Sequence, residues 1–230
     1  MSYSPILIVH GEPNSIFFEI FIKANSHNKI KSPVILISSE KLLKLQMRKL
    51  RVKKKIKILN HENLNINFNQ KKAFEKISNK SNKFIENSFH IAFKILRKKK
   101  VHKFINGPVS KKNFLKNKYL GITEYISKKF SSKKNCMLIY NKSLSVCPVT
   151  THLPIKKVSK NINKKLIKEK IILIENFYKK TLGFKPRIAV LGLNPHCESI
   201  STYNEDKSII KPLIKSIGKK YNISGPFPAD

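Results

Sequence analysis

The amino-acid sequence predicts an α/β fold in which helices flank a mostly parallel sheet. Two short apolar runs near the amino terminus, residues 5–10 and 33–38, end in turn residues, as buried strands do. A third run, residues 187–193, has the continuous apolar character of a strand in a parallel sheet covered on both faces. Helical patterns separate these runs, and this alternation is typical of parallel α/β proteins.

Strands are predicted wherever a short apolar or alternating run ends in turn residues. They cover residues 5–10, 33–38, 53–59, 103–105, 137–140, 143–149 and 187–193. The asparagine-rich segment 60–69 is expected to be a loop, because asparagine favours turns over strands.

Helices are predicted where apolar residues recur at every third or fourth position. They cover residues 42–50, 82–98, 110–117, 123–130, 162–181 and 204–219, after a first helix through Phe17, Ile20 and Phe21. Ser15 and Ser39 precede the first two helices, where a serine hydroxyl can accept a free backbone N–H of the first turn. No linker marks a domain boundary in the sequence.

The composition favours a globular protein of the cytoplasm. The chain has 230 residues, of which 40% are hydrophobic, which is enough to bury a sizeable core. No apolar run approaches the roughly 20 residues that span a bilayer, and residues 1–10 lack the features of a signal peptide. We therefore expect no membrane partner. Cys136, Cys147 and Cys197 have neither disulfide nor zinc spacing and are expected to be buried free thiols.

The formal net charge of +35 raises the alternative of a nucleic-acid-binding protein. Lysine supplies most of this charge, because the only arginines are Arg48, Arg51, Arg97 and Arg187. Base recognition and bidentate phosphate binding favour arginine, and few aromatic residues lie among the basic runs. We therefore predict that nucleic acid is not the partner and that the positive field attracts small anionic substrates and cofactors.

Polar clusters follow several predicted strands, at residues 10–13, 106–111, 150–154 and 194–198. Ligands of open α/β sheets bind at the carboxyl ends of strands, so these clusters mark the candidate site. The last two each place a histidine, His152 or His196, on a short loop beside a proline. Such imidazoles suit a divalent metal, although a single histidine is more often structural and two do not complete a catalytic site.

Several common catalytic motifs are absent from the sequence. No GxGxxG segment follows the first predicted strand, and no GxxxxGK[ST] segment occurs, so the usual dinucleotide and P-loop motifs are excluded. A GxSxG nucleophile elbow is also missing. Asp and Glu together number only 13, so we do not expect a site rich in paired carboxylates.

Three segments, in this order, resemble the 4-hydroxythreonine-4-phosphate dehydrogenase family of vitamin B6 synthesis. They are residues 149–154 (VTTHLP), 187–196 (RIAVLGLNPH) and 225–230 (GPFPAD). Residues 107–111 (GPVSK), 121–124 (GITE) and 11–19 are similar to further motifs of this family. The resemblance covers essentially the whole chain.

The resemblance implies a two-lobed architecture, like that of isocitrate and isopropylmalate dehydrogenases, and a homodimer with its site at the subunit interface. It implies that NAD oxidises 4-phosphooxy-L-threonine and that the product loses CO2 to give 3-amino-2-oxopropyl phosphate. A divalent ion (zinc, magnesium or cobalt) is held by three histidines in the family, and His152 and His196 match two of them. Thr123 matches a substrate-binding position, and Lys111 is a candidate for the substrate phosphate, or else a plain surface lysine.

Departures from the family pattern leave alternatives open. Ile122 replaces a family histidine, and isoleucine cannot hydrogen-bond a phosphate or hydroxyl. A paralogue that oxidises a phosphorylated four-carbon sugar acid, threonate or erythronate 4-phosphate, is therefore the second hypothesis. The family's third metal histidine and most of its NAD-binding residues follow the segment matched by 225–230. We therefore expect residues 1–230 to be an incomplete dehydrogenase that lacks its C-terminal part and is inactive alone.

Overall fold

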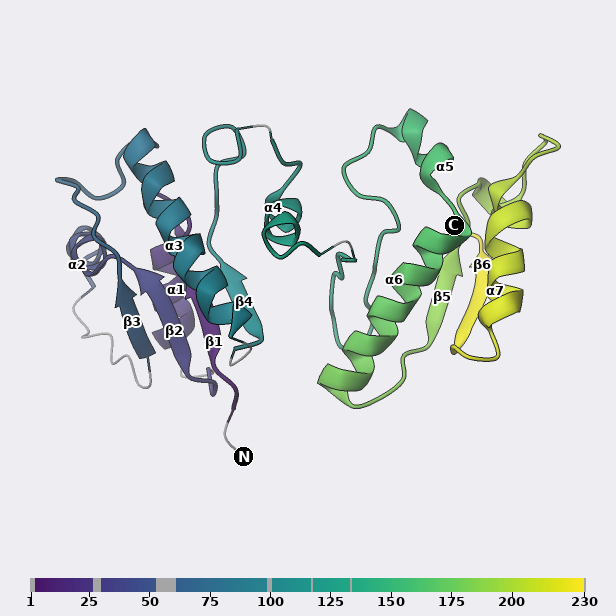
Figure 1. Ribbon diagram of the computed structural model, residues 1–230, viewed down its shortest axis with the longest axis horizontal. Helices are drawn as coiled ribbons and strands as arrows, with labels where there is room; N and C mark the ends of the chain where they lie inside the picture. The colour runs from purple at the N-terminus through teal and green to yellow at the C-terminus, as the bar shows by residue number, and fades with distance from the viewer. Residues whose placement is uncertain are drawn as a thin grey trace. The chain divides into compact units, whose positions relative to one another are not determined.

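The structure, a computed structural model, describes residues 3–26, 30–52, 61–98, 101–116, 118–132 and 134–229. The chain divides into two compact units, Met1–Lys129 (unit 1) and Phe130–Asp230 (unit 2). Each unit contains parallel strands and the helices that pack on them (Figure 1). This is the α/β class that the sequence predicts.

Unit 1 is built on a four-stranded sheet in the order β3-β2-β1-β4, in which every pair is parallel. The strands are β1 (Ile6–Val9), β2 (Val34–Ser38), β3 (His61–Asn65) and β4 (Lys103–Asn106). In the centre, Ile6 of β1 pairs with Val34 on one side and with Lys103 on the other. Because the strands run in the same direction, the loops after them meet at one edge of the sheet.

Helices lie on both faces of this sheet. In the described part of unit 1 they are α1 (Phe17–Ser26), α2 (Glu40–Lys49), α3 (Asn79–Arg97) and α4 (Ile122–Lys129). In Figure 1, α3 crosses the near face of the sheet and α1 lies behind it. Alternate strand residues point to opposite faces, so Ile8 and Leu36 pack with Phe18 of α1, whereas Leu7 and Val9 are buried on the other side.

Unit 2 contains a two-stranded parallel sheet of β5 (Ile188–Leu191) and β6 (Ile223–Phe227). Its helices are α5 (Val158–Asn161), α6 (Lys164–Phe177) with a π-helical end (Tyr178–Leu182), and α7 (Lys211–Ile217) after a π-helical turn (Asp206–Ile210). Short 3-10 helices occur at Ile155–Lys157 and Pro195–Cys197. The core of the unit joins Ile167 and Ile171 of α6 to Leu213 and Ile217 of α7.

Several elements differ from the sequence-based prediction. The predicted loop 60–69 contains β3, because pairing with β2 outweighs the low strand preference of asparagine. Residues 110–116 form turns instead of a helix, and residues 137–149 form only one isolated antiparallel bridge, between Ile139 and Val146. The predicted strand 53–59 lies outside the described residues.

The strand predicted at residues 187–193 is present and parallel, but it is not buried on both faces. Half-buried and exposed residues alternate along β5, and Leu191 is 56% exposed. The sheet of unit 2 has two strands, and the alternating exposure indicates that only one face of β5 is packed within the described residues of the unit.

No helix among the described residues has the length and apolar character needed to cross a membrane. The three cysteines are free, as predicted, but they are half-buried and not fully buried. Burial, together with the nearby Cys136, raises the pKa of the Cys147 thiol to about 11. This thiol is therefore protonated at neutral pH, which makes it a poor nucleophile.

Candidate functional site

The loops that follow β1 and β4 cross at the carboxyl edge of the sheet in unit 1. The Glu12 N–H donates to the carbonyl oxygen of Pro108 at 2.7 Å. Gly107 passes so close to the first loop that a Cβ there would lie 1.9 Å from the His10 carbonyl oxygen. Only glycine fits this crossing, and the crossing fixes the start of the predicted cluster 106–111.

His10, in the first predicted cluster, is a structural residue. Its ring is fully buried, its Nδ1 lies 2.7 Å from the Ser38 hydroxyl, and its centroid lies 4.7 Å from that of Phe17. Burial lowers the pKa of His10 to about 3, so the imidazole is neutral at physiological pH. A ring that is enclosed and this weakly basic links β1 to β2 and does not serve as a general base.

Glu12 is the other titratable group of this cluster, and it is 4% exposed. One carboxylate oxygen accepts the Asn14 N–H at 3.1 Å, whereas Oε2 has no hydrogen-bond partner among the described residues. Burial raises the pKa of Glu12, because a charged carboxylate is poorly stabilised away from water. Its surroundings therefore favour the protonated form more than water does.

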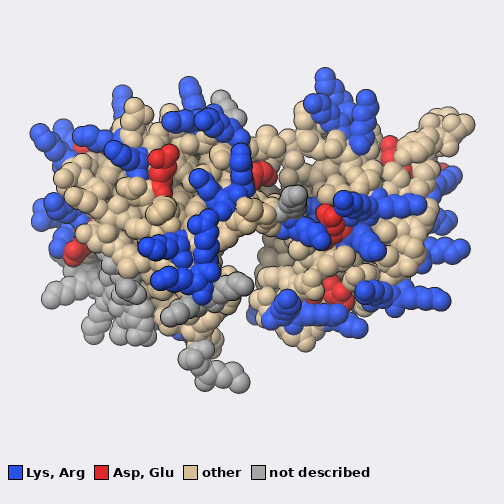
Figure 2. Space-filling view, in the orientation of Figure 1, with Lys and Arg blue, Asp and Glu red and all other residues tan. Residues whose placement is uncertain are grey.

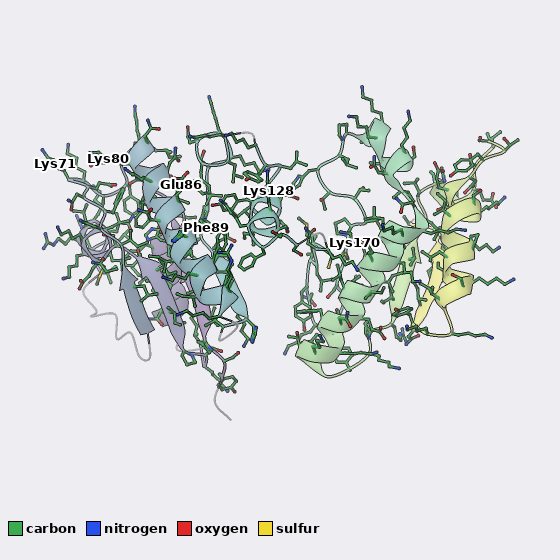
Figure 3. All side chains as sticks on the ribbon, viewed as in Figure 1. Lys71, Lys80, Glu86, Phe89, Lys128 and Lys170 are labelled. Atoms are coloured by element: carbon green, nitrogen blue, oxygen red, sulfur yellow. The ribbon has the colours of Figure 1, made fainter. Side chains whose placement is uncertain are left out.

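The structure brings together the segments that carry Lys111 and Thr123. Lys111 is exposed in a turn, and Thr123 is half-buried in the first turn of α4. Phe114 follows Lys111, Tyr125 follows Thr123, and the centroids of these two rings lie 5.4 Å apart. Both rings also pack against Phe89 of α3 (Figure 3). One aromatic cluster therefore positions both predicted substrate-binding segments.

A buried carboxylate holds the loop that leads to His196. Asp206, 1% exposed, accepts hydrogen bonds from the Leu193 N–H at 2.8 Å and the Asn194 N–H at 3.0 Å. It also accepts one from the Asn194 side chain at 2.9 Å. The sequence analysis did not single out Asp206. The only signal for it is an acid at the start of a predicted helix, where carboxylates are common for other reasons.

The two predicted metal ligands are exposed and lie on left-handed backbone. The φ angle is 57° at His152 and 54° at His196, a region that residues other than glycine rarely occupy. His196 follows β5, as expected, but His152 follows no strand, because the preceding segment forms only the isolated bridge. Both histidines belong to unit 2, whereas Lys111 and Thr123 belong to unit 1.

The donor set for a metal is incomplete in the described residues. They contain no group of three or more His, Cys, Asp or Glu side chains that could hold a metal ion. Two imidazole nitrogens have the right chemistry for a divalent ion such as zinc, but a catalytic site usually needs about three protein ligands. His152 and His196 therefore fit part of such a site.

Comparison with known sequences places the chain in one family. The sequence pattern of the family described as pyridoxal phosphate biosynthetic protein PdxA matches residues 25–230. The 4-hydroxythreonine-4-phosphate dehydrogenase of Sulfurihydrogenibium sp. is 30% identical, over 98% of this chain and 74% of the relative. The protein of the same name from Wigglesworthia glossinidia brevipalpis is 33% identical, over 99% of this chain and 73% of the relative.

Solved structures of proteins described as 4-hydroxythreonine-4-phosphate dehydrogenases have the same fold. The one from Burkholderia phymatum has a TM-score of 0.82 and 20% identity, over 100% of this chain and 76% of that chain. The one from Klebsiella pneumoniae has a TM-score of 0.80 and 20% identity, over 98% and 75%. These matches confirm the predicted α/β architecture. Because the family pattern matches most of the chain, the protein belongs to the PdxA family of pyridoxal phosphate biosynthetic proteins.

Proposed function

We propose that this protein is the oxidoreductase that converts 4-phosphooxy-L-threonine to 3-amino-2-oxopropyl phosphate, with NAD as oxidant and with loss of CO2. Family membership supports a role in pyridoxal phosphate biosynthesis, and the names of two relatives support a dehydrogenase that acts on 4-hydroxythreonine 4-phosphate. The observation that carries the proposal is the pair of exposed histidines, His152 and His196, on left-handed backbone in unit 2.

His152 and His196 would supply two imidazole ligands to a divalent ion, zinc, magnesium or cobalt, and the remaining ligands would come from outside the described residues. When bound, such an ion acidifies the substrate hydroxyl and polarises the ketone that forms. Both histidines are exposed, as ligands of an ion at the surface of the unit would be. The contribution of Asp206 is to hold the backbone that presents His196.

Lys111 and Thr123 would bind the substrate in this proposal. The Lys111 ammonium is exposed and suits a phosphate, and the Thr123 hydroxyl can donate to or accept from a substrate oxygen. The aromatic cluster of Phe89, Phe114 and Tyr125 supports both segments. A rigid support of this kind reduces the entropy that substrate binding must overcome.

NAD is proposed as the hydride acceptor because no protein side chain accepts a hydride. The sequence has no GxGxxG segment after β1, so we assign no residue of this chain to NAD. Cytoplasmic location and the absence of a nucleic-acid partner stay predictions.

A homodimer is also part of the proposal. Large apolar side chains are exposed on unit 2, among them Ile139, Leu144, Ile155 and Leu191. Apolar surface of this kind often marks a protein–protein contact. A second copy of the chain would cover it and would add ligands from another subunit to the site.

Cobalt binding tests the metal ligands without reference to activity. We expect Co²⁺ to produce visible absorption with the unaltered protein, and to bind at least about tenfold more weakly to His152→Gln and His196→Gln. His90→Gln is the control, because His90 is an exposed histidine on α3. Equal binding by all three variants would contradict the assignment.

The reaction itself is tested with the complete product of the gene. We expect NADH to form from NAD, 4-phosphooxy-L-threonine and a divalent ion, and chelation to stop it. Threonate 4-phosphate and erythronate 4-phosphate are assayed in parallel. The reason is that Ile122, at the start of α4, has no side-chain group that could hydrogen-bond the substrate. Faster NADH formation from a sugar acid would replace the proposed substrate, and no NADH from any of them would refute the dehydrogenase.

A further inference from the structure

A hollow of about 430 Å³ lies in unit 1, beyond the carboxyl ends of β2 and β3. Its walls come from the loop after β1 (Asn14), the first turn of α2 (Lys41), the segment after β3 (Phe68 and Lys71) and the first turn of α3 (Lys80). Small-molecule sites typically measure about 300 to 1,000 Å³. The hollow is therefore large enough for a metabolite.

The charge that lines the hollow is positive. Lys41, Lys71 and Lys80 line it together with a single acid, Glu75. The ammonium groups of Lys71 and Lys80 make no hydrogen bond or ion pair with any described residue. The Glu75 carboxylate accepts the Lys72 backbone N–H at 2.9 Å and keeps its single negative charge. Three lysines against one acid leave the lining with a formal charge of +2.

Two helix ends add to this positive potential. Lys41 and Lys80 lie in the first turns of α2 and α3, where the helix dipole is positive and an acid is usually favoured. The first turn of α2 has such an acid, Glu40, which is paired with Lys44. The first turn of α3 contains no acid, and α3 is 19 residues long. Lysines at such ends repel the dipole unless an anion lies between them, so the arrangement favours occupancy by a negatively charged group.

We propose that this hollow binds a small phosphorylated anion, with its phosphoryl group between Lys71 and Lys80. Figure 3 shows these two lysines at the same end of unit 1, one after β3 and one at the start of α3. The Gln70 side chain, which donates to the Asn14 Oδ1 at 2.8 Å, supplies polar groups, and Phe68 supplies an apolar wall for the organic part.

This site goes beyond the proposed function. None of its lining residues is Lys111, Thr123, His152 or His196. Lysines are spread over the visible face of both units (Figure 2), and a neighbouring hollow of about 450 Å³ is also basic, lined by Arg48, Lys49 and Lys72. A hollow lined by a few cations suits a compact anion better than a long polymer, which would need a continuous basic track.

Pyrophosphate is the probe, and calorimetric titration at constant ionic strength measures its dissociation constant. The test variant is Lys71→Gln/Lys80→Gln. The matched control is Lys94→Gln/Lys103→Gln, which removes the same charge from exposed lysines elsewhere in unit 1. Lys94 lies on α3 itself, about 21 Å along the axis from Lys80, and Lys103 begins β4 at the opposite edge of the sheet.

We expect the hollow variant to bind pyrophosphate about tenfold more weakly than the unaltered protein, since charge-assisted hydrogen bonds to phosphate are lost. The control should bind within about twofold of the unaltered protein, because distant surface charges are screened by salt. Both variants should melt at the same temperature as the unaltered protein, because the hollow lysines have no partner to lose. Equal weakening in both variants, or no binding by the unaltered protein, would overturn the proposal.

Discussion

At the residue scale, the loop crossing beside His10 depends on the missing side chain of Gly107. A Cβ at Gly107 would lie 1.9 Å from the His10 carbonyl oxygen, a backbone atom that cannot rotate away, and 2.8 Å from the Phe17 ring. We expect Gly107→Ala to lower the free energy of unfolding by about 2 kcal/mol or more. Gly183→Ala is the control: the φ of 82° at Gly183 disfavours alanine, but nothing lies within 4 Å of its Cβ position, so this variant tests backbone strain without crowding. Urea melts that show no larger loss for Gly107→Ala would contradict the crossing.

The buried His10 makes stability depend on pH. Its pKa is about 3 in the fold against 6.5 for an ordinary histidine, so protonation favours the unfolded chain. This contribution to stability is complete above pH 6.5 and declines as the pH falls toward 3. Between about pH 7 and pH 5, we expect the unaltered protein to lose about 2 kcal/mol more than His10→Asn does. Urea titrations of both proteins at pH 7 and pH 5 measure these losses of unfolding free energy, and equal losses would contradict the role of His10.

The candidate site could be predicted from the sequence only where a side chain has its own chemical signature. His152 and His196 are recognisable because an imidazole beside a proline suggests a rigid metal ligand, and their role stays a prediction. Asp206 could not be found, because its partners are the backbone N–H groups of residues 193 and 194. Every residue except proline has a backbone N–H group, so the sequence does not show which of these groups a carboxylate binds.

At the element scale, the loop between β5 and the 3-10 helix Pro195–Cys197 depends on one carboxylate. Asp206→Ala removes three hydrogen bonds and leaves buried donors without partners. We expect a loss of about 3 kcal/mol and faster amide exchange at Leu193 and Asn194. Glu205→Ala is the control, since Glu205 makes only a 3.3 Å contact with Asn194. Unchanged exchange in Asp206→Ala would show that other contacts fix the loop.

Elements with a strong apolar pattern could be predicted, and those that depend on tertiary pairing could not. The long stripe of α3 and the apolar runs of β1 and β2 lie where the pattern places them. β3 contains four polar residues in five and becomes a strand only because β2 offers it a parallel partner. The boundary after Lys129 was also not visible, because contact within each unit, and not a glycine-rich linker, defines it.

At the scale of the whole molecule, the exposed apolar side chains of unit 2 predict self-association. We expect light scattering after gel filtration to give twice the chain mass, and Ile155→Asp to shift the protein toward monomer, because a charge in an apolar contact is strongly unfavourable. Ile155 is 90% exposed, so the change should leave the fold intact. Ile16→Asp, at an exposed position of unit 1, is the control. A monomer at every concentration would contradict the homodimer.

The left-handed backbone at His152 and His196 implies that stability and function favour different residues at these two positions. Each left-handed histidine lowers the stability of the fold by about 1 kcal/mol relative to glycine. Selection for stability alone would therefore favour glycine at both positions, so a histidine is expected there only if its imidazole has a function. His196→Gly should therefore raise the midpoint of chemical denaturation, whereas His90→Gly, inside helix α3, should lower it. If the His196→Gly variant is more stable but no longer binds cobalt, the histidine contributes metal binding at the cost of fold stability.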